Sequence, residues 1–500
     1  MSVAADKVHR PYVLICVMLA VFLASIEVTI VATAMPQIVA ELGGFDLYGW
    51  VFAAVLLAQA ATTVIFGKLS DIYGRKPILI IGVVFFLVGS LLCGFAWSMP
   101  ALILFRIVQG IGMGSLQPVS MTVFGDLYTP EERVRMQGYL AAVWGVSAVV
   151  GPLAGGLIVQ HMTWPFVFWL PIPVGIATII GLQLYLHENV EEKKPAIDYA
   201  GAGLVTIAVV SLLMVLTLVG QPTPNTGAIA LSGAVFVLSL PLLWWQERRA
   251  PDPVIAFDLW THRAIASGNT ATLFAGMVFM GATTFLPVYV QAVMWRSPLV
   301  AGVAVTMIAV GWPIAAVVCP RLYKRQGMRF TARMGGFLIV AGAVPFLFLR
   351  PEMSPLYVAA ASTLIGFGLG FLMSTVTVLV QGSVKWAQRG SATASIVFAR
   401  TLGNALGAAV LGSIVNVTLA TQSVSPEEIR GLLGHAAAAA PPPLHLRAAL
   451  DHGLHLAFWG IFTVAIATLI AAFAVPTREL HELSGGISKQ RLQPQSKEPE

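Results

Sequence analysis

The sequence has few charged residues, few cysteines and no nucleotide-binding loop. Only 10% of its 500 residues are charged, whereas a soluble domain carries about a quarter, so an ordinary water-soluble enzyme is excluded. Its three cysteines, Cys16, Cys93 and Cys319, form no C-x-x-C pair, which gives no indication of zinc or of a disulfide framework. G-x-x-x-x-G-K-[ST] is also absent, so we expect no P-loop for ATP. Any pumping must use an ion gradient or a partner, and we expect no cofactor and no metal.

Apolar residues dominate instead. They make up 57% of the chain, and the mean hydropathy is +0.83. A helix needs about 20 mostly apolar residues to cross a bilayer, and its backbone groups must be satisfied within the segment. We therefore predict an all-α integral membrane protein with fourteen transmembrane helices. Their ranges are 12–34, 48–67, 78–97, 101–123, 138–160, 165–186, 200–220, 227–246, 267–291, 299–320, 332–349, 355–379, 394–417 and 454–475.

Lys and Arg are distributed asymmetrically between the predicted loops. Most of the 29 lie in the two tails and in alternate loops, and the opposite side holds Arg296, Arg350, Arg430 and Arg447. Cytoplasmic loops carry the excess of these residues, so we predict that both termini are cytoplasmic. The net charge of +6 follows from this topology and gives no reason to expect a nucleic-acid partner.

A weak internal repeat indicates two related halves. The loop at 67–76 has a distant echo at 320–329, in which Gly327 corresponds to Gly74 but Lys324 stands in place of Asp71. Repeated halves are how many transporters are built, with the substrate site between them. We therefore predict two six-helix bundles with two inserted central helices. The predicted parts are an N-terminal bundle at 1–186, a cytoplasmic linker with the inserted helices at 187–266, a C-terminal bundle at 267–475 and a disordered cytoplasmic tail at 476–500.

Three ionisable residues lie inside predicted helices: Glu27, Arg106 and Arg400. Such groups are costly in hydrocarbon and by default indicate an ion or substrate pathway. Glu27 and Arg106 both fall in the outer half of the membrane, so they can pair. A buried carboxylate that loses a nearby cation takes up a proton, which is a device for proton coupling. The alternatives are a permanent structural ion pair, or an Arg106 that only satisfies backbone carbonyls. For Arg400 the alternative is a side chain that snorkels to the membrane surface.

The cytoplasmic loop after the second predicted helix has the composition of a conformational latch. Asp71 and Arg75 lie four residues apart at a helix end. An acid there can dock against the positive end of a neighbouring helix, and a base can pair with Asp126 or with lipid headgroups. The alternative, a solvated positive-inside loop, explains the charges but not the glycines. The predicted latch consists of Gly67, Asp71, Gly74, Arg75, Lys76 and Asp126.

Clusters of small residues predict close helix packing. In the fifth predicted helix, five small or helix-breaking residues within twelve predict a kink and a close contact with a neighbouring helix. Glycine triplets at 110–114 and 366–370 look like nucleotide fingerprints only superficially, because each lies inside an apolar helix without a preceding strand. The cluster in the fifth helix consists of Gly145, Gly151, Pro152, Gly155 and Gly156.

With these features the chain resembles the major facilitator superfamily, and in particular its fourteen-helix drug:proton antiporter branch, the multidrug-efflux type. The resemblance runs nearly end to end. Residues 67–77 resemble the loop 2–3 signature, residues 106–112 the helix 4 proton-transfer motif, and residues 151–156 the helix 5 antiporter motif, which marks exporters. Residues 27–36 and 400–407 are similar to the branch's helix 1 and helix 13 patterns.

The chain departs from that pattern at a few places. Glu27 replaces the usual Asp, which keeps the carboxylate with one more methylene, and Ala32 replaces an Asn, which removes a polar contact. After the fifth helix the chain has Trp-Pro-Phe at 164–166 and Leu-Pro-Ile-Pro at 170–173. We therefore expect a different bend at the start of the sixth helix.

The resemblance implies alternating access by two bundles that exchange protons for a drug across a bacterial inner membrane. Substrates of relatives are typically lipophilic cations, dyes and antibiotics, and a cavity for cations would need aromatic faces and an acid. Glu27 supplies the acid, and the other lining residues that we select are Trp50, Gln59, Gln117, Trp144 and Gln291. Relatives in Gram-negative bacteria often work with a periplasmic adaptor and an outer-membrane channel.

Two other functions stay open. The same fold could export one endogenous product, such as a lipid, a siderophore or a secondary metabolite. A transporter-like sensor or a membrane enzyme is the third hypothesis, but no catalytic constellation in the sequence supports an enzyme.

Overall fold

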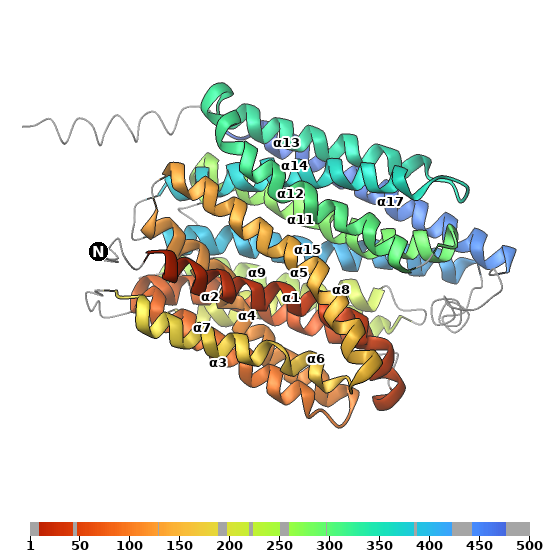
Figure 1. Ribbon diagram of the computed structural model, residues 1–500, viewed down its shortest axis with the longest axis horizontal. Coiled ribbons are helices and arrows are strands. Elements are labelled where there is room, and N and C mark those ends of the chain that lie inside the picture. The colour runs from red at the N-terminus through yellow and green to blue at the C-terminus, as the bar shows by residue number, and fades with distance from the viewer. Residues whose placement is uncertain are drawn as a thin grey trace, which may run out of the picture.

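The computed structural model describes residues 10–43, 48–128, 130–188, 198–219, 224–250, 260–296, 298–384, 388–422 and 443–476. Within these ranges the regular elements are all helices (Figure 1). The predicted tail, apart from its first residue, and most of the predicted central linker lie outside the described residues.

Two bundles make up most of the molecule. The first contains α1 (Arg10–Leu42), α2 (Tyr48–Tyr73), α3 (Arg75–Gly94), α4 (Met99–Leu127), α5 (Pro130–His161), α6 (Pro165–Trp169) and α7 (Pro171–Tyr185). The second contains α11 (Arg263–Val288), η2 (Tyr289–Val293), α12 (Pro298–Gln326), α13 (Met328–Ala343), η3 (Val344–Phe348), α14 (Pro355–Gly382), α15 (Arg389–Thr421) and α17 (Leu444–Phe473).

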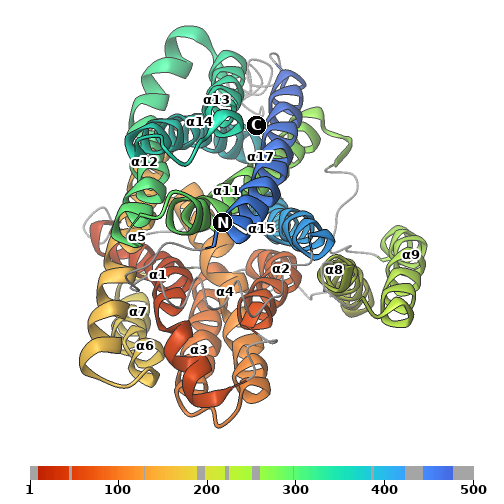
Figure 2. The same ribbon diagram turned by 90° about the vertical axis from the view of Figure 1, so that its right-hand side faces the viewer.

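The inserted helices α8 (Tyr199–Val219) and α9 (Thr226–Arg249) lie beside the two bundles (Figure 2). Helix α8 packs against α2 of the first bundle and α15 of the second, and α9 packs against α8. Large apolar side chains on α9 remain exposed, among them Leu231, Val237 and Leu238. An apolar outer surface of this kind suits contact with lipid.

Each of the fourteen predicted segments lies on a helical span. Eleven of the described helices are long and apolar enough to cross a membrane, and α2 makes a twelfth if its bent segments count as one span. The other two predicted spans correspond to α5 and α8, whose apolar stretches, Gly138–Gly151 and Gly203–Leu216, are shorter. The sixth span consists of α6 and α7, and Leu170 between them keeps helical φ and ψ of −55° and −40°. Only the hydrogen bonding is interrupted there, because Pro171 has no N–H to donate.

The two bundles repeat one packing scheme around α4 and α14. Gly110 and Gly114 of α4 abut α2, whereas Gly112 between them abuts α3. In α14, Gly366 and Gly370 abut α12, whereas Gly368 between them abuts α13. Added Cβ atoms would overlap these neighbours, so the triplets allow each helix to fit between two others. The predicted role of the triplets in close packing is confirmed.

Candidate functional site

Glu27 and Arg106 form a buried ion pair inside the first bundle. Glu27 lies on α1 and Arg106 on α4, and each side chain is 1% exposed. Arg106 Nε also donates a hydrogen bond to the carbonyl oxygen of Val51 on α2, at 3.1 Å. The predicted pairing is present, and it joins three helices of one bundle through charges that lie away from water.

A chain of hydrogen bonds holds Arg106 on its other side. Its Nη1 donates to Gln109 Oε1 at 2.8 Å, and Gln109 Nε2 donates to Ser90 Oγ at 3.2 Å. Ser90 in turn donates to the carbonyl oxygen of Phe168, at 2.6 Å. Gln109 was not among the site residues selected from the sequence, although its position three residues after Arg106, on the same face of α4, could have indicated it.

Arg75 organises the predicted latch within the first bundle. Its Nη2 donates to Asp71 Oδ1 at 3.0 Å and its Nε donates to Asp126 Oδ2 at 3.1 Å. Its Nη1 donates to the carbonyl oxygen of Ser70 at 2.9 Å. The Arg75 side chain is 1% exposed, and those of Asp71 and Asp126 are 8% and 0% exposed. A solvated loop would leave these groups in water, so the structure favours a packed ionic network.

Asp71 also connects the two bundles. Its Oδ2 accepts hydrogen bonds from the backbone N–H of Ser391 at 2.8 Å and from the Ser391 hydroxyl at 3.0 Å. Its Oδ1 accepts one from the backbone N–H of Gly390 at 3.2 Å. These donors lie at the start of α15, where the helix dipole attracts negative charge. Nearby, Arg389 Nη1 donates to the carbonyl oxygen of Gly125 at 3.3 Å. The sequence did not indicate which helix would receive Asp71.

The glycines of the latch have separate roles. Gly74 precedes α3 with φ 96°, a left-handed conformation that favours glycine. Gly67 lies against Ala394 of α15, so a Cβ at this position would overlap that residue. One glycine therefore shapes the turn and the other permits contact between the bundles.

The end of the latch is also tied to the region after α7. Lys76 Nζ donates a hydrogen bond to the carbonyl oxygen of Gln183 at 3.0 Å, and the backbone N–H of Arg75 donates one to Glu188 Oε2 at 2.7 Å.

Helix α5 carries the predicted antiporter motif and also lies between the bundles. Gly151 and Gly155 are buried, whereas the packing of Pro152 and Gly156 lies outside what the structure describes. Closer to the start of α5, a Cβ at Gly145 would lie 3.3 Å from the carbonyl oxygen of Ala309 on α12. The small residues of α5 thus allow a close approach to the second bundle.

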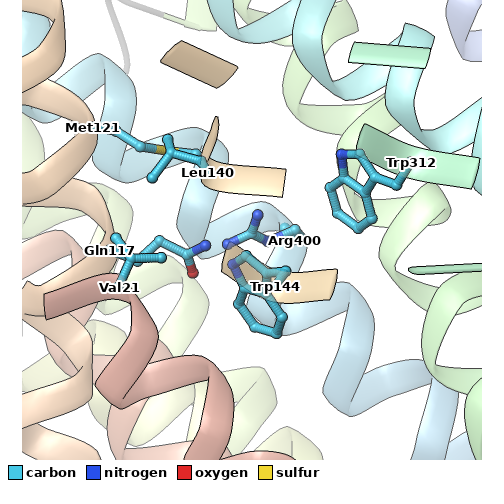
Figure 3. Close-up of a pocket in the computed structure, with 7 residues that line it drawn as sticks. All are labelled: Val21, Gln117, Met121, Leu140, Trp144, Trp312 and Arg400. Carbon is cyan, nitrogen blue, oxygen red and sulfur yellow. The ribbon is translucent and has the colours of Figure 1, made fainter. Parts of the chain in front are cut away.

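A pocket lies between the bundles and receives residues from both. Gln117 on α4 and Trp144 on α5 come from the first bundle, and Trp312 on α12 and Arg400 on α15 come from the second (Figure 3). Arg400 lines this pocket. The sequence had left its role open between a ligand pathway and snorkelling to the membrane surface. The complete described lining is Val21, Gln117, Met121, Leu140, Trp144, Trp312 and Arg400.

The structure brings two of the five residues selected for the cavity into this pocket, Gln117 and Trp144. Trp50 packs instead against a cluster shared by α2, α8, α9 and α15. Gln59 is buried, and its carbonyl oxygen accepts a hydrogen bond from the Thr63 hydroxyl at 2.7 Å. Gln291 lies in η2, with its side chain outside what the structure describes. Glu27 is not among the described lining residues, since it lies against Arg106.

The described parts of the chain contain no group of three or more His, Cys, Asp or Glu that could hold a metal ion. The described side chains of this region form a buried ion pair, an ionic network around Arg75, and a polar and aromatic pocket.

Comparisons with known proteins identify one family. Residues 17–408 match the family described as Major Facilitator Superfamily. Multidrug resistance protein 3 of Bacillus subtilis (strain 168) is 32% identical over 415 residues, which are 83% of this chain and 81% of that protein. Efflux pump FUS6 of Gibberella moniliformis is 28% identical over 433 residues, which are 84% of this chain and 77% of that protein. In fold, the chain is similar to the crystal structure of the human organic anion transporter MFSD10 (TETRAN), with a TM-score of 0.64, 14% identity, and coverage of 91% of this chain and 99% of that one.

Proposed function

The chain belongs to the major facilitator superfamily, a family of membrane transporters, and we propose that it is a proton-coupled antiporter that exports lipophilic toxic compounds. Export is supported by the names of its relatives, which are a multidrug resistance protein and efflux pumps. The helix 5 motif is a second support, because it resembles the pattern that marks exporters. A preference for lipophilic cations rests on the resemblance alone.

The observation that carries proton coupling is the ion pair between Glu27 and Arg106. Both side chains are 1% exposed, so neither charge has water to solvate it. Protonation of Glu27 would cancel the attraction and leave Arg106 to its bonds with Val51 and Gln109. Removing one partner of a buried pair costs about 3–5 kcal/mol, which is enough energy to change how α1 packs against α4. The carboxylate would thus take up and release the coupling proton.

Alternating access is supported by the latch. Asp71 accepts hydrogen bonds from the start of α15 in the other bundle, so the two bundles are held together where the loop 67–76 lies. Opening this end requires those bonds to break. A transporter that alternates between two states needs such contacts to favour one of them. We propose that the described state is closed at this end.

The orientation is part of the proposal. The excess of Lys and Arg in alternate loops predicts that the latch and both termini face the cytoplasm. The chain would then work in a bacterial inner membrane and expel compounds away from the cytoplasm. A periplasmic adaptor and an outer-membrane channel stay a prediction from the resemblance.

Proton release from inside-out vesicles tests this function. Vesicles that contain the full chain are acidified inside, and lumenal pH is followed with a fluorescent dye while lipophilic drugs are added. We expect drug-dependent proton release, and we expect the Glu27→Gln variant to lose it. Glu352→Gln is the matched control, because Glu352 is exposed in the segment between η3 and α14. Unchanged proton release in Glu27→Gln would contradict the assignment of the coupling residue.

The alternative is export of a single endogenous product by the same fold. Absence of proton release with every drug of the panel, combined with unchanged drug tolerance in cells that lack the protein, would favour it. The secreted metabolites of the cell would then form the next panel.

A further inference from the structure

The pocket between the bundles contains one charged residue among its described lining residues. That residue is Arg400, and the others are apolar or carry neutral polar groups. Figure 3 shows Gln117, Trp144 and Arg400 converging on the pocket, with Trp312 facing them from the second bundle. The charge that the described lining presents to a ligand is therefore positive.

The Arg400 side chain points into the pocket between the bundles (Figure 3). Arg400 is eleven residues beyond the start of α15 at Arg389. At 1.5 Å per residue this is roughly 16 Å along the helix, about half the thickness of the hydrocarbon core. Val21, another lining residue, lies equally far beyond the start of α1 at Arg10. Arg400 therefore lies inside the helical span, about a third of the way along the 33 residues of α15.

Arg400 also lacks the partner that Arg106 has. Within the described residues its guanidinium forms no hydrogen bond and no ion pair. Arg400 is half-buried. A ligand that displaces water from the pocket would leave this cation without solvent, which is costly unless the ligand supplies a negative charge. A guanidinium is also well shaped to bind a carboxylate or a sulfonate with two parallel hydrogen bonds.

We propose that this pocket binds aromatic organic anions, and that Arg400 pairs with the carboxylate or sulfonate of the exported compound. The Gln117 amide would donate a hydrogen bond to the same group, while Trp144 and Trp312 would pack against the aromatic part. The ligand would contact both bundles, as a site between two repeats requires. This inference rests on the proposed export function and names its substrate class.

A lipophilic cation fits the same pocket less well. The indole faces of Trp144 and Trp312 could attract it, but Arg400 would repel it at short range. Glu27 does not supply the missing negative charge, because it is already paired with Arg106. The described lining thus favours the opposite charge to the one that the resemblance implies.

Binding of three dansyl compounds that differ mainly in charge tests the inference. Dansylglycine is anionic, dansylamide is neutral and dansylcadaverine is cationic. Energy transfer from tryptophan to dansyl is measured with the full chain in nanodiscs, without a proton gradient, and the signal of empty nanodiscs is subtracted. We expect dansylglycine to bind about tenfold or more tightly than dansylcadaverine, because hydrogen bonds to charged groups contribute that much.

Variants of Arg400 assign the preference to its side chain. We expect Arg400→Met to weaken binding of dansylglycine about tenfold and to change binding of dansylamide less than about twofold, whereas Arg400→Lys retains part of the preference. Arg350→Met is the matched control, since Arg350 is an exposed arginine outside the helices. The ranking of the three compounds in the unmodified chain tests the proposal even if a variant does not fold.

Three results would overturn the inference: equal or tighter binding of the cation, no binding of dansylglycine, or an anion preference that persists in Arg400→Met. These results are distinguishable from failure of the proposed function. Anion binding without proton release in vesicles would contradict the antiport and leave the inference standing. Proton release driven by cations alone would support the antiport and contradict the inference that the pocket binds anions.

Discussion

The two bundles share a packing scheme but differ in where their charges lie. Gly112 of α4 and Gly368 of α14 occupy the same place between two neighbouring helices, and Gly74 and Gly327 make the same left-handed turn, with φ 96° and 87°. In the first bundle the buried Arg106 is paired with an acid, whereas the Arg400 side chain of the second bundle points into the pocket. Packing repeats because the fold requires it. The difference in charge would follow from the proposal that Glu27 and Arg106 couple protons and that Arg400 binds the exported compound.

The largest difference between the bundles should be in protein stability after removal of Arg106 or Arg400. Arg106→Met leaves the Glu27 carboxylate buried without a partner, and we expect it to lower the stability of the protein by about 3–5 kcal/mol. Arg400→Met removes a cation that has no described partner, so we expect stability to be unchanged or raised. Thermal unfolding can be followed with a thiol-reactive dye, because Cys16, Cys93 and Cys319 are buried and react only on unfolding.

The double variant Glu27→Met/Arg106→Met is the control for that comparison. It removes both charges together, and we expect it to recover most of the lost stability. Equal destabilisation by Arg106→Met and Arg400→Met would show that the two arginines play the same structural part.

The next largest effect should be on the balance between the closed and open states. It compares the corresponding loops at 67–76 and 320–329. Asp71→Asn removes the charge that α15 binds, and we expect the closed state to lose about 2–3 kcal/mol relative to the open state. Lys324 occupies the corresponding position and is exposed, so we expect Lys324→Ala to change this balance by less than about 0.5 kcal/mol. Spin labels at Tyr73 and Arg325, which end α2 and nearly end α12, would report the distance between the bundles. A distance that does not increase in Asp71→Asn would contradict the role of Asp71 in the latch.

The glycine triplets should give smaller and matched effects. Gly112→Ala would force a Cβ against the backbone of Phe86, and in Gly368→Ala the new Cβ would lie 2.6 Å from the carbonyl oxygen of Gly335. We expect each to lower stability by about 1–3 kcal/mol, the usual cost of overpacking. The same dye assay measures both, and a large effect in one bundle only would show that the packing is not equivalent.

Among the glycines, the smallest effect should come from the turn at Gly327. Nothing lies within 4 Å of a Cβ built there, so Gly327→Ala costs only the left-handed backbone, about 1–2 kcal/mol. We expect Gly74→Ala to cost a similar amount and also to reduce transport, because the next residue, Arg75, holds the latch. Equal transport by the two variants would contradict that difference.

The hydrophobic pattern predicted the fold well because the bilayer imposes one rule on every span. A helix in lipid must satisfy its own backbone and be apolar over about 20 residues, so the fourteen segments could be found without knowing their neighbours. The pairing of Glu27 with Arg106 could also be predicted, since charges at equal depth in neighbouring helices have few other partners. The cavity residues were harder, because the choice of Trp50 and Gln59 depended on which face of each helix turns to the other bundle.

The sequence by itself determined the membrane class, the number of helical segments, the internal repeat and the acid and base of the buried pair. Each of these follows from residue type and spacing along one helix or loop. Only the tertiary structure decided that Asp71 reaches the start of α15, that Gln109 supports Arg106, and that Arg400 faces a pocket with Gln117 and Trp144. The reason is physical: these contacts join helices far apart in sequence, and their partners are fixed by how the helices rotate and pack and not by the pattern within any one of them.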